Sequence, residues 1–142
     1  MPPTHPGIDI DWLYPGYKEH GGTEDDRENF SKLLLEVREA LNAYQEETGN
    51  APLGGGAYGL TAALPCGPEH IDFLDVPFLS EVLDGLNLMT YDFHNEEEPR
   101  TGTNSPLFDQ EWDEVPGLSV DGCVTNYRRG GAGDHAEKIN VG

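Results

Sequence analysis

Residues 7–15 read GIDIDWLYP, and this stretch decides the fold. Side chains alternate along a strand, so Asp9, Asp11 and Leu13 share one face and the apolar side chains between them share the other. An acidic face opposite an apolar face is typical of a barrel strand with helices outside it and an acid-lined cavity inside. Pro15 ends the strand, which places position 13 at its carboxyl end. In α/β barrels that end carries the catalytic groups.

The rest of the chain alternates between helical patterns and short apolar runs. Apolar residues at helical spacing between Phe30 and Tyr44 predict a helix that begins with Thr23 as its N-cap, three residues before Asp26, and ends near Gly49. Further strands are predicted over residues 58–64, 86–91 and 138–141, and further helices over residues 77–83 and 120–127. A long acidic loop separates residues 95 and 120. This order predicts a parallel sheet with right-handed crossovers.

Length and charge limit the classes of function. The chain has 142 residues, which is enough for one domain with a core, whereas a complete (β/α)8 barrel needs about 250. The 27 acids against 8 bases give a net charge of -19, which argues against nucleic acid as a partner. A neutral polymer or small ligand carries no such penalty. We expect no membrane partner and no signal peptide, because no apolar run is long enough for either.

Cysteine and histidine residues give weaker indications. Cys66 and Cys123 allow at most one disulfide, and two buried free thiols fit the sequence at least as well, so the compartment stays open. Four histidines lie in loops without metal-ligand spacing: His5, His20, His70 and His135. We therefore expect no metal and no cofactor. His94 is interpreted as a hydrogen-bonded structural residue, and Tyr58 and Phe73 as packing residues.

Two motifs resemble one known family. GIDIDWLYP resembles the signature strand of family 18 glycoside hydrolases, the chitinases and chitinase-like lectins, whose pattern is DGxDxDWEYP in several variants. LNLMTYDFH at residues 86–94 resembles a later strand of that family, often MTYDFHG. TAALP (61–65), TGTNSPL (101–107) and KINVG (138–142) fall in the expected order between and after these motifs. The resemblance covers nearly the whole chain.

The resemblance implies a fold. The family has a (β/α)8 barrel, and the matched strands would be its fourth to seventh. Residues 1–142 are therefore expected to form a single incomplete domain, a partial TIM-type barrel of class α/β, without the first three strands and without everything after the seventh. Such a piece leaves two sheet edges uncovered, so we expect the isolated chain to be marginally stable or prone to aggregation.

The resemblance also implies a chemistry, which is substrate-assisted retention. Asp11 would orient the N-acetyl group of the sugar, and Asp9 would share a proton with Asp11, so that the two titrate as a coupled pair. Tyr91 and Asp92 would contact the N-acetyl group, and Met89 would line the floor of the site. Because adjacent strand residues point to opposite faces, Tyr91 and Asp92 can both reach the site only where the strand ends or bulges.

Position 13 is the main departure from the family pattern. Leu13 stands where the family has the glutamic acid that protonates the departing oxygen, and leucine has no proton to give. Losing a general acid typically costs about 10²–10⁴ in rate. Trp12 and Tyr14 flank this position and are candidate sugar-binding residues. Two smaller departures are Pro6, in place of the first aspartate of the motif, and Asn95, in place of a frequent glycine.

Three hypotheses about function remain open. The first is a chitinase-like domain that binds chitin or N-acetylglucosamine oligomers without cleaving them. The second is a chitinase with residual or alternative acid catalysis, for example from a carboxyl group of residues 96–98. The third is an inactive, truncated gene product. Leu13 favours the first and third over the second, and the short length favours the third over the first. By family resemblance we expect an extracellular or secretory location.

Overall fold

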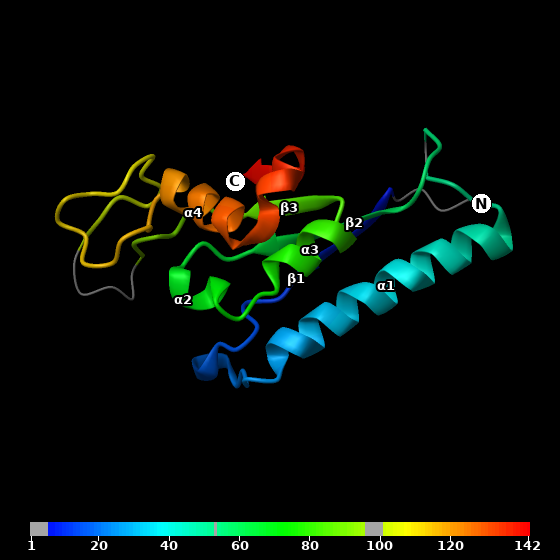
Figure 1. Ribbon diagram of the computed structural model, residues 1–142, viewed down its shortest axis with the longest axis horizontal. Coiled ribbons are helices and arrows are strands. Elements are labelled where there is room, and N and C mark those ends of the chain that lie inside the picture. Colours follow the sequence, from blue (N-terminus) through cyan, green and yellow to red (C-terminus); the bar gives the residue numbers. More distant parts are fainter. Residues whose placement is uncertain (1–5, 53, 96–100) are drawn as a thin grey trace.

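The computed structural model describes residues 6–52, 54–95 and 101–142 of the chain. Four strands form one parallel sheet in the order β1–β2–β3–β4. They are β1 (Gly7–Asp11), β2 (Gly59–Leu64), β3 (Gly85–Leu88) and β4 (Ile139–Val141). The predicted parallel sheet is confirmed, and strands that follow one another along the chain are neighbours in the sheet (Figure 1).

Helices make the connections between the strands. They are α1 (Asp26–Thr48), α2 (Pro68–Ile71), α3 (Val76–Val82) and α4 (Val120–Tyr127), with short helical turns η1 (Lys18–His20), η2 (Arg128–Ala132) and η3 (Gly133–Lys138). The bounds predicted for α4 are confirmed, with the Ser119 hydroxyl as its N-cap, and those of α3 are shifted by one residue. The sequence analysis missed α2, because its flanking glycine and prolines are typical of a loop.

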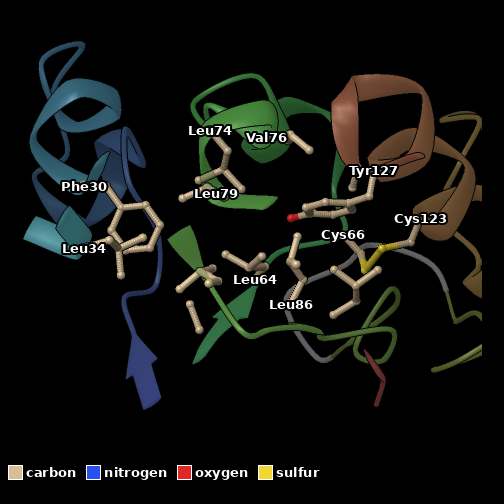
Figure 2. Close-up of a cluster of buried hydrophobic side chains, with 14 of the residues drawn as sticks. Phe30, Leu34, Leu64, Cys66, Leu74, Val76, Leu79, Leu86, Cys123 and Tyr127 are labelled. Carbon is tan, nitrogen blue, oxygen red and sulfur yellow. A yellow bond between two sulfur atoms is a disulfide. The ribbon is translucent and has the colours of Figure 1, made fainter. Parts of the chain in front are cut away.

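A hydrophobic core fills the space between the sheet and the helices (Figure 2). Alternate side chains of β2 point into it, so Leu60, Ala62 and Leu64 are buried while their neighbours are partly exposed. The helices contribute the opposite side of the core through Leu34, Leu79 and Tyr127. The sheet therefore has one face covered by helices, as predicted for a barrel strand.

Two strands end earlier than the sequence predicts. β1 ends at Asp11, so Leu13 lies beyond the strand and not on its acidic face. β3 ends at Leu88 and not at Tyr91, because the Thr90 N–H donates to the Leu88 carbonyl oxygen at 3.0 Å and turns the chain out of the sheet. Both corrections concern the carboxyl edge, where the backbone bends away into the candidate site.

The start of α1 also differs from the prediction. Thr23 does not cap the helix as an acceptor, since its N–H and its hydroxyl each donate to the Asp26 carboxylate at 2.9 Å. The Gly16 N–H donates to the same carboxylate at 2.9 Å. Asp26 therefore joins the loop after β1 to the first turn of α1. The predicted end of the helix is confirmed, because Gly49 closes it with a left-handed φ of 65°.

Two covalent or polar links tie the helix layer to the sheet. Cys66 and Cys123 form a disulfide, which decides between the two alternatives and joins the residue after Pro65 to α4. At the amino ends of β2 and β3, the Arg38 guanidinium donates to the Tyr58 carbonyl oxygen at 2.8 Å and pairs with the Asp84 carboxylate. Within the described residues, no helix is long and apolar enough to cross a membrane.

Candidate functional site

The predicted site residues lie at the carboxyl edge of the sheet. Tyr14 follows β1, and Met89, Tyr91 and Asp92 follow β3. These four side chains, far apart in the sequence, line one cavity of about 750 Å³. Pro65, at the end of β2, contributes to its wall. A cavity of this size at the carboxyl ends of parallel strands is where α/β folds bind their ligands.

Electrostatics bring Asp11 into the same group. Burial raises the pKa of the Tyr14 phenol above its ordinary value, and the nearby carboxylates of Asp11 and Asp92 raise it further. Tyr91 adds a smaller contribution in the same direction. The Tyr14 hydroxyl is therefore a neutral hydrogen-bonding group held beside two carboxylates. Residues from two separate segments of the chain, 11–14 and 91–92, therefore lie close together.

Asp9 lies on the open face of the sheet, beside the cavity and not in its lining. Its Oδ1 atom accepts hydrogen bonds from the Thr61 hydroxyl on β2 and from the Asn87 amide on β3, the latter at 3.0 Å. The Asn140 amide on β4 donates in turn to the Asn87 side-chain oxygen at 2.9 Å. A polar row thus crosses all four strands. Within the described residues, no hydrogen bond joins Asp9 to Asp11.

Position 13 lies just outside the sheet. The Leu13 side chain is 45% exposed, and its peptide bond to Tyr14 is cis. The Leu13 carbonyl oxygen lies 3.0 Å from Nδ1 of His20, which belongs to η1. The backbone here is held by a ring nitrogen, while the side chain offers no group that can bind or release a proton.

Trp12 points away from the cavity. Its ring packs edge-on against Phe30 of α1, with 5.8 Å between the ring centroids. It also contacts the hydrophobic core and does not line the cavity. Strand alternation explains this, because Trp12 continues the apolar face of β1. The structure therefore brings Tyr14, Met89, Tyr91 and Asp92 together and leaves Trp12 on the helix side.

The turn after β3 allows Tyr91 and Asp92 to share one site. Asp92 has a φ of 57°, which is uncommon for a residue other than glycine. The Asn104 amide donates to the Asp92 carboxylate at 2.6 Å. The expectation that the strand must end here is confirmed, since both residues line the cavity only beyond the end of β3.

Two histidines in the site were missed by sequence reasoning. The His70 ring stacks on Tyr14 with 4.6 Å between centroids, and Tyr17 meets both His70 and His20 edge-on. All four line the cavity, although 50 residues separate the two histidines. No spacing in the sequence links them, because they meet only through the unforeseen helix α2 and turn η1. Within the described residues, no cluster of three or more His, Cys, Asp or Glu side chains could hold a metal ion.

The surroundings of His94, Tyr58 and Phe73 are also defined by the structure. His94 is hydrogen-bonded as expected, with Nε2 2.9 Å from the Asp113 carboxylate and both side chains nearly buried. Tyr58 is buried in packing contacts, including an edge-on contact with Tyr44. Phe73 differs from the expectation, because its ring lines the cavity as well as packing over Gly16.

Comparisons with known proteins agree with the observed fold. The family model described as "Glycosyl hydrolases family 18" matches residues 5–142. Chitotriosidase-1 of Mus musculus is 34% identical over 139 residues, which cover 96% of this chain and 28% of the mouse protein. A family 18 N-acetylglucosaminidase from Paenibacillus barengoltzii superposes with a TM-score of 0.82 at 34% identity, over 95% of this chain and 38% of that one.

A third similar protein was solved with a sugar bound. It is catalytic domain 2 of the Ostrinia furnacalis Group II chitinase, in a glutamate-to-leucine mutant and in complex with penta-N-acetylchitooctaose, (NAG)5. Its TM-score is 0.79 at 30% identity, over 95% of this chain and 33% of that one. The chain thus spans less than two fifths of the length of each of these three proteins.

Proposed function

The chain belongs to family 18 of the glycosyl hydrolases, and we propose that it binds chitin or N-acetylglucosamine oligomers without cleaving them. One contrast carries this proposal. Tyr14, Tyr91 and Asp92 line a single cavity, whereas the position of the family's proton donor holds Leu13. We also propose that the four strands correspond to the fourth to seventh strands of a (β/α)8 barrel. Four neighbouring parallel strands and the partial coverage of each relative support a consecutive part of such a barrel.

The cavity suits a neutral N-acetylated sugar. The rings of Tyr14 and Tyr91 offer apolar surface for the sugar ring, and their hydroxyls offer hydrogen bonds at its edge. The Asp92 carboxylate can accept a hydrogen bond from an acetamido N–H, a charge-assisted interaction of about 1.5–3 kcal/mol. The strong negative net charge of the chain would repel an anionic ligand, whereas it does not repel a neutral oligomer.

Cleavage also requires a proton donor at the departing oxygen. In substrate-assisted retention the N-acetyl oxygen attacks the anomeric carbon while an acid protonates the departing oxygen. Asp11 raises the pKa of the nearby Tyr14 phenol, and we assign it the orienting role from the family resemblance. The aliphatic side chain of Leu13 cannot supply the proton. A glutamate-to-leucine mutant of a similar chitinase was solved with (NAG)5, which supports the view that a family 18 domain holds the sugar after such a replacement.

We propose an extracellular or secretory location. The disulfide between Cys66 and Cys123 supports it, because disulfides persist in oxidising compartments and are rare in the cytosol. Cys66 lines the cavity, and both cysteines are almost inaccessible to solvent.

Calorimetric titration of the 142-residue chain with chitopentaose tests the proposal. We expect saturable binding, and Asp92→Ala should weaken it at least about tenfold, because a hydrogen bond to a charged group is lost. Asn50→Ala is a matched control, since its amide bonds the Tyr44 hydroxyl at 3.0 Å and lies outside the cavity. Absence of chitopentaose binding by the unchanged chain would overturn the proposal.

A further inference from the structure

Asn104 makes two contacts with the turn that carries Asp92. Its side-chain Nδ2 donates to Asp92 Oδ1 at 2.6 Å, across a separation of 12 residues. Its backbone carbonyl oxygen accepts from the Phe93 N–H at 3.0 Å. One residue of the loop after β3 therefore holds both the carboxylate of Asp92 and the peptide that follows it. Asn104 belongs to TGTNSPL, a motif without an assigned role in the binding described above.

The backbone of Asp92 is also unusual. Its left-handed φ of 57° is uncommon outside glycine, and aspartate is one of the few other residues that adopt it readily. Within the described residues, the only hydrogen bond to the Asp92 carboxylate comes from Asn104. The direction of that carboxylate, which lines the cavity, is thus fixed from outside the cavity by one amide group.

Neighbouring contacts seat the loop but do not reach the carboxylate. The Ser105 hydroxyl donates to the Thr90 carbonyl oxygen at 2.5 Å. Gly102 lies so close to the His94 ring that a Cβ atom there would come within 2.3 Å of it. These contacts hold the loop against the turn that follows β3. Among the described residues of this loop, Asn104 is the one whose side chain hydrogen-bonds the Asp92 carboxylate.

We propose that Asn104 is a positioning residue for ligand binding. Its amide occupies Oδ1 of Asp92, and Oδ2 is thereby presented to the acetamido N–H of the sugar. This inference rests on the proposed function, since it assigns Asn104 a role through Asp92 in the same site. An amide suits the role, because it donates a hydrogen bond to the carboxylate without carrying a charge that would compete with the sugar for that carboxylate.

Two substitutions at position 104 separate positioning from folding. Asn104→Ala removes the donor, and we expect chitopentaose affinity to fall about tenfold at every pH. Asn104→Asp keeps the shape but places two carboxylates together, which repel at neutral pH and can share one proton in acid. Relative to the unchanged chain, Asn104→Asp should therefore bind about tenfold more weakly at pH 7.5 and recover most of that loss at pH 4.5.

Calorimetry with chitopentaose at both pH values, with circular dichroism of each variant, decides the matter. Asn50→Ala again serves as the matched amide control and should bind like the unchanged chain. Normal affinity in a folded Asn104→Ala, or an Asn104→Asp deficit that does not change with pH, would overturn the positioning role while the proposed function stands. If the unchanged chain does not bind chitopentaose, the proposed function and this inference both fail. Should Asn104→Ala not fold, the isosteric Asn104→Asp gives the answer alone.

Discussion

The Tyr127 hydroxyl on α4 donates a hydrogen bond of 2.7 Å to the carbonyl oxygen of Pro65, the residue that follows β2. Tyr127 is fully buried, and burial raises the pKa of its phenol far above the ordinary value. Pro65 in turn belongs to the wall of the cavity. The position of this wall therefore depends on a hydrogen bond made inside the core, where no water competes for the acceptor.

Tyr127→Phe should destabilise the chain by about 1–3 kcal/mol, because the Pro65 carbonyl oxygen then remains buried without its donor. The ring and its packing are retained, so the loss reports the hydroxyl alone. Urea unfolding followed by fluorescence measures the change. Tyr44→Phe is the control, since its hydroxyl is on the exposed side of α1. Equal stability of Tyr127→Phe and the unchanged chain would show that the bond contributes nothing.

Removal of the disulfide should cost more. The bond joins residues 57 apart, and in the chain-entropy model a loop of that length corresponds to about 4 kcal/mol. We expect Cys66→Ala combined with Cys123→Ala to lower the unfolding free energy by about 2–4 kcal/mol. The unchanged chain in reducing buffer should show a similar loss. A double variant that unfolds at the same urea concentration as the oxidised chain would contradict this expectation.

Acid should weaken the start of α1 through Asp26. Hydrogen bonds from the Gly16 and Thr23 N–H groups hold the pKa of this carboxyl below its ordinary value. A lowered folded-state pKa contributes stability above the unfolded-state value of about 4, and that stability is lost as the pH falls through the folded-state pKa. Asp26→Asn should therefore be less stable at neutral pH and show a shallower decline in acid. Unfolding free energies from pH 2 to 7 measure this.

A neighbouring carboxylate controls for the loss of charge. Asp25 precedes the helix but makes no capping hydrogen bond with its side chain. Asp25→Asn should therefore keep the steep acid decline that Asp26→Asn loses. If the unfolding free energy falls equally steeply in acid for the unchanged chain and for Asp26→Asn, Asp26 is not the source of the decline.

The outer strands should make the isolated chain prone to association. β1 and β4 are the edges of the sheet, and Ile8 on β1 is 43% exposed. The net charge of -19 opposes association at low salt, and added salt screens that repulsion. Size-exclusion chromatography should thus show more aggregate as salt rises, and less for Ile8→Lys. A monomer at every salt concentration with a sharp cooperative melt would contradict this.

Much of the fold follows from patterns that the sequence displays directly. The apolar run of β2 and the helical spacing after Phe30 are local patterns, and they predict β2 to within one residue and the end of α1. The strand ends were misjudged, because Met89 and Tyr91 continue an apolar run after the backbone has left the sheet. The role of Thr23 was reversed, since a hydroxyl can donate as well as accept and Asp26 is the stronger acceptor.

Only those residues of the site that lie in a sequence motif could be predicted. Tyr14 and Asp92 lie in the two recognised motifs, and both line the cavity. His70 and His20 were assigned to unrelated loops, and only the folded chain brings them together around Tyr17. The contact of Asn104 with Asp92 depends on how the loop after β3 folds back, which no local pattern specifies.

We propose that Leu13 separates binding from cleavage beside a cavity that Tyr14, Tyr91 and Asp92 line. Chromatographic analysis of chitopentaose after incubation with the unchanged chain and with Leu13→Glu tests it most directly. We expect no shorter oligomers from the unchanged chain, and cleavage by Leu13→Glu at a rate that exceeds any background by about 10²–10⁴. Equal cleavage by the chain that carries Leu13 would contradict the account.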